Sequence, residues 1–206
     1  MSTAKPRSIS AKQKKVLIAG AVIAALLLYL ITAFNGFVNR EEDVNREWGR
    51  LQSAYQRRID LVPRLVAVVK ASTDYEKQTL QKLAEARAQA AQVQLNPGSA
   101  DGPNYKKLEE IQAQMAGNMN RVIAIIENYP NLRGDTAFRR LQDQLSGTEN
   151  RILVARNDFT QTVVQYNKKV RGFPSGMVAG LFGFKKKTGF EADKGAEKAV
   201  EVKFNK

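Results

Sequence analysis

The sequence predicts an all-α protein with a single N-terminal transmembrane helix followed by an antiparallel four-helix bundle. Two observations support this prediction. An uncharged, strongly apolar run extends from Val16 to Phe34, and a helix of that length spans roughly 28 Å, about the thickness of a hydrocarbon core. After this run, apolar residues recur three or four positions apart almost to the end of the chain, which is the periodicity of helices with one buried face.

Charge is distributed unequally on the two sides of the apolar run. Residues 1–15 carry five basic and no acidic side chains, whereas acidic and basic residues are mixed after residue 39. Lysine and arginine beside a span resist translocation, so we expect a cytoplasmic N-terminus and a bundle outside the bacterial inner (cell) membrane, periplasmic in a Gram-negative cell. A cleaved signal peptide is the main alternative. Residues 35–38 contain no A-x-A cleavage pattern, which favours a retained single-pass anchor over residues 16–38.

Residues 39–70 form the first predicted bundle helix. Pro63 lies inside it and lacks the backbone N–H that would bond near Ile59, so we expect a kink or a local change of hydrogen bonding. Thr73–Glu76 has the spacing of a capping box, which predicts a second helix from there to about Gln94. The apolar face of the first helix consists of Val44, Trp48, Leu51, Tyr55, Ile59, Val62, Val66 and Val69.

Turn-forming residues divide the second half of the chain. Residues 95–103 are rich in Pro, Gly, Asn and Asp, and Pro103 suits the first position of a third helix, which ends near Pro130. A fourth helix is expected from an N-cap at Asp135. Its apolar positions alternate in steps of three and four, as in a bundle or coiled coil: Phe138, Leu141, Leu145, Thr148, Ile152, Ala155, Phe159, Thr162 and Tyr166.

These four segments are of lengths that can cover one another if the chain reverses near Ser72, Pro97 and Pro130. The predicted organisation is therefore a basic segment over residues 1–15, an anchor and its exit over 16–38, a helical bundle over 39–171, and a Gly-rich apolar strap with a basic tail over 172–206. With three reversals, the fourth helix returns toward the anchor, so Val170 is expected near its exit.

Several strings of residues resemble the LemA family of bacterial membrane-anchored helical proteins over roughly residues 35–190. The resemblance implies a four-helix bundle behind one membrane helix and no particular activity. The strings that carry it are Trp48, Gln56–Val66, Glu85–Arg87, Tyr129–Leu132, Phe138, Leu141–Gln142, Thr148–Ile152, Ala155–Arg156, Tyr166–Asn167 and Phe173–Pro174.

Composition argues against most enzyme classes. The chain has no Cys and no His, which removes disulfides, thiolate nucleophiles, His-based triads and the usual zinc sites. Its densest carboxylates are adjacent on helices and point in different directions. We therefore expect no catalytic residues, no cofactor and no metal. The net charge of +13 is concentrated at the chain ends without a nucleic-acid motif, so a membrane surface explains it better than a nucleic acid does.

A charged group surrounds Pro63 and is the candidate site for binding a protein partner. It consists of Arg57, Arg58, Asp60 and Arg64. Asp60 and Arg64 have the spacing of an intrahelical ion pair, worth a few tenths of a kcal/mol at most. The group is interpreted either as solvated charges at the rim of the bundle or as a partner-recognition patch.

The segment 172–187 combines apolar side chains with Gly and Pro, which disfavour a long helix. It is interpreted either as a strap folded over the end of the bundle or as an interfacial membrane contact with lysines at the head groups. The candidate membrane-contact residues are Leu181, Phe182, Phe184, Lys185, Lys186 and Lys187.

Taken together, these patterns favour a non-enzymatic, membrane-anchored scaffold or adaptor for envelope or membrane proteins. Its expected partners are the lipid bilayer, through Val16 to Phe34, and a protein of unknown identity; the oligomeric state is left open. The alternative is a membrane-linked sensor in which a ligand shifts the bundle helices, with the Pro63 kink as the bistable element.

Overall fold

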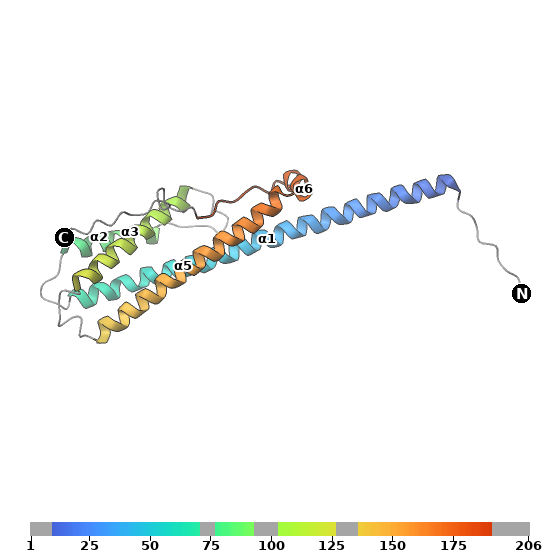
Figure 1. Cartoon of the computed structure of the whole chain (residues 1–206). Helices are drawn as coiled ribbons and strands as arrows, with labels where there is room; N and C mark the ends of the chain where they lie inside the picture. The colour runs from blue at the N-terminus through green and yellow to red at the C-terminus, as the bar shows by residue number, and fades with distance from the viewer. Residues whose placement is uncertain (1–9, 71–76, 93–102, 127–135, 191–206) are drawn as a thin grey trace, which may run out of the picture. The chain divides into compact units, whose positions relative to one another are not determined.

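Residues 10–70, 77–92, 103–126 and 136–190 are described by the computed structural model. Within these ranges the chain forms five helices and no strands (Figure 1). They are α1 (Ala11–Lys70), α2 (Lys77–Gln92), α3 (Pro103–Ile126), α5 (Thr136–Arg171) and α6 (Ser175–Phe182). The all-α prediction is confirmed for this part of the chain, including the start of a helix at Pro103.

Several predicted features lie outside the described residues. They are residues 1–9, the capping box at Thr73–Glu76, the reversals near Ser72, Pro97 and Pro130, the N-cap at Asp135, and the tail from residue 191.

The chain divides into two compact units. Unit 1 consists of residues 1–42 and 166–186, and unit 2 of residues 43–165 and 187–206. Helices α1 and α5 each contribute residues to both units. The two units are described separately.

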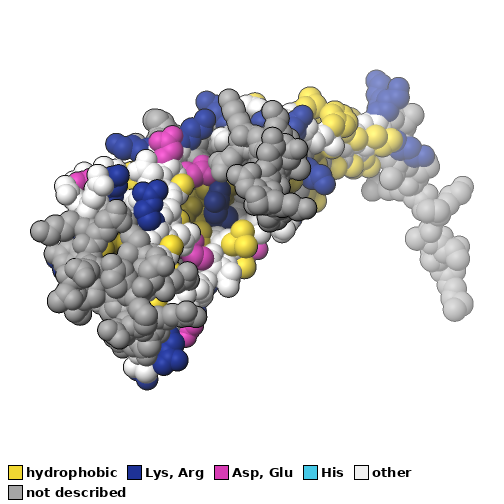
Figure 2. Space-filling model, turned by 60° about the vertical axis from the view of Figure 1, so that its left-hand side comes forward, with side chains coloured by type: hydrophobic (Ala, Val, Ile, Leu, Met, Phe, Trp, Pro, Cys, Tyr) yellow, Lys and Arg dark blue, Asp and Glu magenta, His cyan; other side chains and the backbone are white. Residues whose placement is uncertain are grey.

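Helix α1 is continuous over 60 residues. It includes the apolar run and the first predicted bundle helix, with no break near residue 38 and none at Pro63. It is long and apolar enough to cross a membrane: its most apolar 18-residue stretch has a mean hydropathy of 2.6 and is only 6% buried. Figure 2 shows hydrophobic side chains gathered on the N-terminal part of this helix. A core helix of a soluble protein would instead hide these side chains.

Unit 2 is held together by one apolar cluster to which α1, α2, α3 and α5 all contribute. Fully buried members include Leu65, Leu83 and Met115 from the first three helices, and Phe138 of α5 is 2% exposed. Helices α2 and α3 pack directly against each other (Figure 1). The apolar face predicted for residues 44–69 is buried throughout, apart from Val66, which is half-buried.

Within unit 2, α1 and α5 run antiparallel. The rings of Trp48 and Phe159 lie 5.3 Å apart between centroids, and the side chains of Arg58 and Glu149 form an ion pair. Ten residues forward along α1 thus correspond to ten residues back along α5. At about 1.5 Å per residue, the two helices keep one register over this length.

The buried face of α5 departs from the predicted pattern at two positions, because Ala155 and Thr162 are half-buried. Val163 is buried and Thr162 is half-buried, whereas the pattern predicted Thr162 for the buried face. Alternating steps of three and four average 3.5 residues per turn, and an α-helix has 3.6, so a straight helix gradually rotates away from a strict heptad stripe. The step from Phe159 to the next buried residue is therefore four.

In unit 1, the end of α5 and the short helix α6 pack against α1. Val178 and Ala179 of α6 form a buried cluster with Ala33 and Phe37 of α1, and Val170 packs on it. The predicted return of the last long helix to the end of the apolar run is confirmed by this contact of Val170. The two-turn α6 ends at Gly183, whose φ of 78° favours glycine.

Candidate functional site

The four residues of the predicted partner-binding group point to different places. Arg58 is buried, with 4% of its surface exposed, whereas Arg57, Asp60 and Arg64 are exposed. Asp60 accepts a hydrogen bond from Gln56 Nε2 at 2.8 Å and forms no ion pair with Arg64. The structure therefore does not bring the group together as one site, and only Arg57 lies in the larger groove described below.

Arg58 forms its hydrogen bonds inside unit 2. Its Nε donates to Glu149 Oε1 at 2.8 Å, and its Nη2 pairs with Glu149 Oε2. Its Nη1 donates to the backbone O and to Oε1 of Gln112, at 3.0 and 3.1 Å. One guanidinium thus links α1, α3 and α5. Its two bonds to the Glu149 carboxylate have the bidentate geometry that suits arginine.

Next to this ion pair lies a polar cavity of about 290 Å³, lined by Tyr55, Arg58, Glu109, Gln112 and Arg156 among others. Arg156 Nη2 donates to Glu109 Oε1 at 2.9 Å. Burial raises the pKa of Tyr55 to about 12, although the charges of Arg156 and Arg58 act in the opposite direction. The buried Nε2 of Gln112 has no hydrogen-bond partner among the described residues. Sequence patterns did not point to Gln112, because a lone glutamine on a helix carries no signal.

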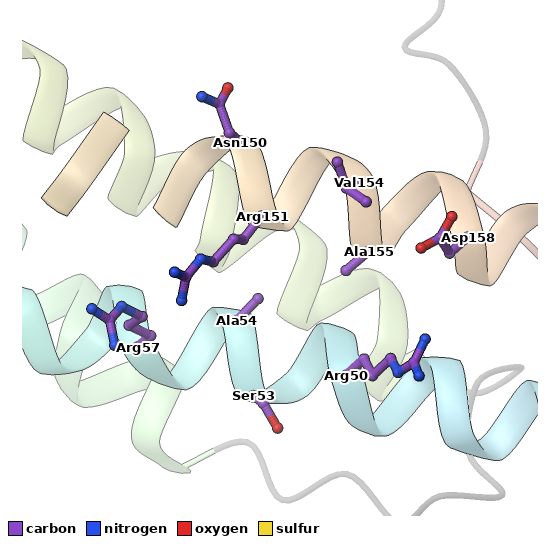
Figure 3. Close-up of a pocket in the computed structure, with 9 residues that line it drawn as sticks. All are labelled: Arg50, Ser53, Ala54, Arg57, Asn150, Arg151, Val154, Ala155 and Asp158. Carbon is purple, nitrogen blue, oxygen red and sulfur yellow. The ribbon is translucent and has the colours of Figure 1, made fainter. Parts of the chain in front are cut away.

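A larger groove of about 610 Å³ lies between α1 and α5 of unit 2 (Figure 3). Ala54 of α1 and Ala155 of α5 face each other across it, and their short side chains leave the space between the two helices open. The residues that line it are Arg50, Ser53, Ala54, Arg57, Asn150, Arg151, Val154, Ala155 and Asp158.

The groove carries an excess of positive charge. Its three arginines face one acidic residue, Asp158. Arg50 donates to both carboxylate oxygens of Glu47, at 3.2 and 3.1 Å. Figure 3 shows Arg57 and Arg151 reaching from opposite helices toward the same part of the groove, and neither forms an ion pair with any described residue.

Arg57 and Arg151, which have no ion-pair partner among the described residues, offer donor groups that suit a carboxylate, because each guanidinium can donate two parallel N–H bonds to one carboxylate. Val154 adds an apolar wall and is 58% exposed. Of the residues that line the groove, only Arg57 belongs to the predicted partner-binding group. The missed signal is Val154, an apolar residue that lies off the regular buried stripe of its helix.

Five of the six candidate membrane-contact residues lie in unit 1, and Lys187 belongs to unit 2. Leu181 is 72% exposed and Phe182 46%. Phe184 is half-buried, and its ring stacks on that of Phe37 with centroids 4.9 Å apart. Lys185 and Lys186 are exposed, and Lys187 is half-buried.

Lys169 of α5 packs against the same part of α1. Its Nζ lies 5.2 Å from the ring centroid of Phe37 and occupies the space beside Gly36, where a Cβ would clash with it. Desolvation lowers the pKa of Lys169, and the charge of Arg40 lowers it further. No group of three or more acidic, His or Cys side chains in the described ranges is placed to hold a metal ion.

A family model matches most of the chain: that of the LemA family, over residues 47–204. The magnetosome protein MamQ of Magnetospirillum gryphiswaldense is 22% identical over 200 residues, which cover 88% of this chain and 74% of that protein. The magnetosome proteins MamQ 1 and MamQ 2 of Paramagnetospirillum magneticum are each 22% identical over 191 residues, covering 82% of this chain and 68% of theirs.

Proposed function

The chain belongs to the LemA family, and on that basis we propose that it is a membrane-anchored, non-enzymatic adaptor that binds a protein partner through its helical domain. In this proposal residues 16–34 of α1 cross the inner membrane with the N-terminus in the cytoplasm. Unit 2 lies outside the cytoplasm as a four-helix bundle of α1, α2, α3 and α5. The exposed apolar surface of α1 supports the anchor, and the shared cluster supports the bundle.

The groove between α1 and α5 is the observation that carries the binding role. Arg57 and Arg151 hold two like charges close together in the groove without a carboxylate between them. An acidic segment of a partner protein would supply that carboxylate and relieve the repulsion. The exposed side chain of Val154 would be covered in the same event. The proposed partner is therefore an envelope or membrane protein with an acidic, partly apolar segment.

Photo-crosslinking from the groove tests this function. A photoreactive amino acid at Val154 of the full-length chain should crosslink in cells to one discrete partner. The double charge reversal R57E/R151E should abolish that product, because the partner's acidic segment would then be repelled.

The matched control is R64E/R140E, which changes the same net charge at exposed arginines of the same two helices outside the groove. It should leave the crosslink unchanged. A crosslink that survives R57E/R151E, or that both double variants abolish equally, would rule out the groove as the binding site.

A sensor is the second candidate function, and the buried Nε2 of Gln112, which has no hydrogen-bond partner among the described residues, favours it. The amide lines the 290 Å³ cavity between helices, where a ligand with a hydrogen-bond acceptor would satisfy it. A panel of amino acids and dicarboxylates should then contain a compound that raises the melting temperature of the wild-type protein but not of Q112M. If no compound gives that difference, the adaptor function remains as the only proposal.

A further inference from the structure

Helix α6 has one face packed on α1 and another left exposed by the described part of the chain. Val178 is 4% exposed and Ala179 1%, and both pack against Ala33 and Phe37. Phe182 also touches α1, since its ring centroid lies 5.0 Å from that of Phe34. These contacts set the rotation of α6 about its own axis.

The opposite face presents an apolar stripe. Phe173 is 88% exposed, Met177 71% and Leu181 72%. Met177 and Leu181 are four residues apart and therefore lie on one side of α6, and Phe173 lies two residues before the helix begins. Large apolar side chains of this kind gain free energy when they leave water, so three together on one short segment call for a covering surface.

The position of α6 along α1 indicates what covers the stripe. The α1 residues that it contacts, 33–37, lie where the apolar run ends at Phe34 and the first charged residue, Arg40, follows soon after. If the run fills the hydrocarbon core, these residues lie at the boundary between acyl chains and head groups. The stripe is therefore held at the depth where amphipathic segments insert.

Basic side chains are placed to contact head groups. Lys185 and Lys186 follow α6 directly, Lys168 and Arg171 precede it, and Lys185, Lys186 and Arg171 are exposed. Unit 1 carries no acidic residue between 166 and 186. This one-sided charge matches an anionic lipid surface, to which each nearby Lys or Arg is attracted.

We propose that α6 is an interfacial helix: Phe173, Met177 and Leu181 insert into the outer surface of the same membrane that α1 spans, and Lys185 and Lys186 bind anionic lipid head groups. This inference rests on the proposed membrane anchor. It gives the protein a second membrane contact, one that holds α1 at a fixed depth through the α6 cluster at Ala33 and Phe37.

Lipid accessibility of single spin labels tests the proposal, and the absence of Cys from the chain makes single-cysteine labelling clean. The full-length M177C variant is labelled with a nitroxide in nanodiscs of phosphatidylethanolamine and phosphatidylglycerol. Its exposure to oxygen, which concentrates in lipid, is compared with its exposure to a water-soluble nickel chelate.

Two further labels serve as controls. L26C lies in the apolar run and reports the anchor, and V164C lies on an exposed position of α5 in unit 2. We expect the oxygen-to-nickel ratio of M177C to be several-fold above that of V164C and below that of L26C. In discs of phosphatidylcholine alone, the ratio of M177C should fall toward the V164C value, and K185Q/K186Q should cause the same fall in the anionic discs.

The outcomes separate the inference from the anchor on which it depends. A water-exposed M177C label beside a lipid-exposed L26C label overturns the interfacial helix and leaves the anchor intact. Protection of M177C from both reagents also overturns it, because a second copy or another protein would then cover the stripe. A water-exposed L26C label refutes the anchor itself.

Discussion

The two side chains of the Arg58–Glu149 ion pair differ in their exposure to solvent. The Arg58 side chain is 5% exposed and that of Glu149 is 42% exposed. A charge left without a partner costs most where water cannot reach it. Replacing Glu149 and replacing Arg58 should therefore lower the free energy of unfolding by different amounts, although both residues take part in the same ion pair.

Removing each partner in turn tests this asymmetry. E149L should lower the free energy of unfolding by about 3 kcal/mol, because it leaves a buried guanidinium without its carboxylate. R58M should lower it by only about 1 kcal/mol, because Glu149 can be hydrated and the methionine fills the space. Urea unfolding of the detergent-solubilised protein measures both. Equal losses would show that burial does not control the cost of this pair.

Tyr55 should make the protein sensitive to alkali. Its pKa is about 12 in the fold, against the ordinary tyrosine value of 10.0, so between these pH values the unfolded chain loses a proton that the folded chain keeps. The contribution of Tyr55 to the free energy of unfolding is complete below pH 10 and declines as the pH rises toward 12. At about 1.4 kcal/mol per pKa unit, the loss reaches about 3 kcal/mol.

The difference in tyrosinate absorbance between wild type and Y55F gives the pKa of Tyr55 directly. Y55F should also remove the corresponding part of the decline in stability above pH 10. A Tyr55 that ionises near pH 10 in the folded protein would contradict the burial that raises its pKa.

At the scale of the helices, the buried stripe of α5 keeps most of the predicted steps of three and four, and it departs from them where Val163 is buried in place of Thr162. The stripe includes Leu145 and Ile152, each 4% exposed, and continues to Val163 at 2%. Its neighbour Val164 is 55% exposed. These two valines differ in burial and hardly at all in sequence context, so they form a matched pair.

V163D should destabilise the protein by about 3 kcal/mol or more, because it buries a carboxylate with no cationic partner. V164D should change stability by no more than about 0.5 kcal/mol, because its side chain stays in water. L145D and I152D should behave like V163D. The free energies come from chemical unfolding, and a cooperative, undiminished transition in V163D would remove that residue from the core.

For the molecule as a whole, the continuity of α1 is the feature that bears most on the proposed adaptor. One helix of 60 residues contains both the apolar run and Arg57, a groove residue. The stretch of α1 between the apolar run and Arg57 is helical throughout.

The orientation in the membrane is open to a direct test. A reporter that is active only outside the cytoplasm, fused after Lys206, should be active, because the basic residues 1–15 resist translocation. An N-terminal tag should remain on the mature protein and so separate a retained anchor from a cleaved signal peptide. Activity of a cytoplasm-only reporter at the same junction would reverse the assigned topology.

Helical periodicity predicted the long helices after the apolar run and most of their buried positions, because burial of one face leaves a repeat of three and four in the sequence. The apolar run itself was evident from its unbroken hydrophobicity, whereas the short helix α6 was not predicted. The family strings Gln56–Val66 and Thr148–Ile152 contain both partners of the Arg58–Glu149 pair, yet nothing in them tells an inward arginine from an outward one. Arg57 and Arg58 are neighbours of the same type.

Only the packing of α1 on α3 and α5 turned Arg58 inward to Glu149 and Gln112, and left Arg57 to the groove with Arg151. The same holds for α6, whose apolar composition was plain but whose exposed and covered faces depend on its contact with Ala33 and Phe37. Local sequence patterns set which residues are helical and apolar. Contacts between residues distant in the chain decide which side chains of equal chemistry remain available for binding.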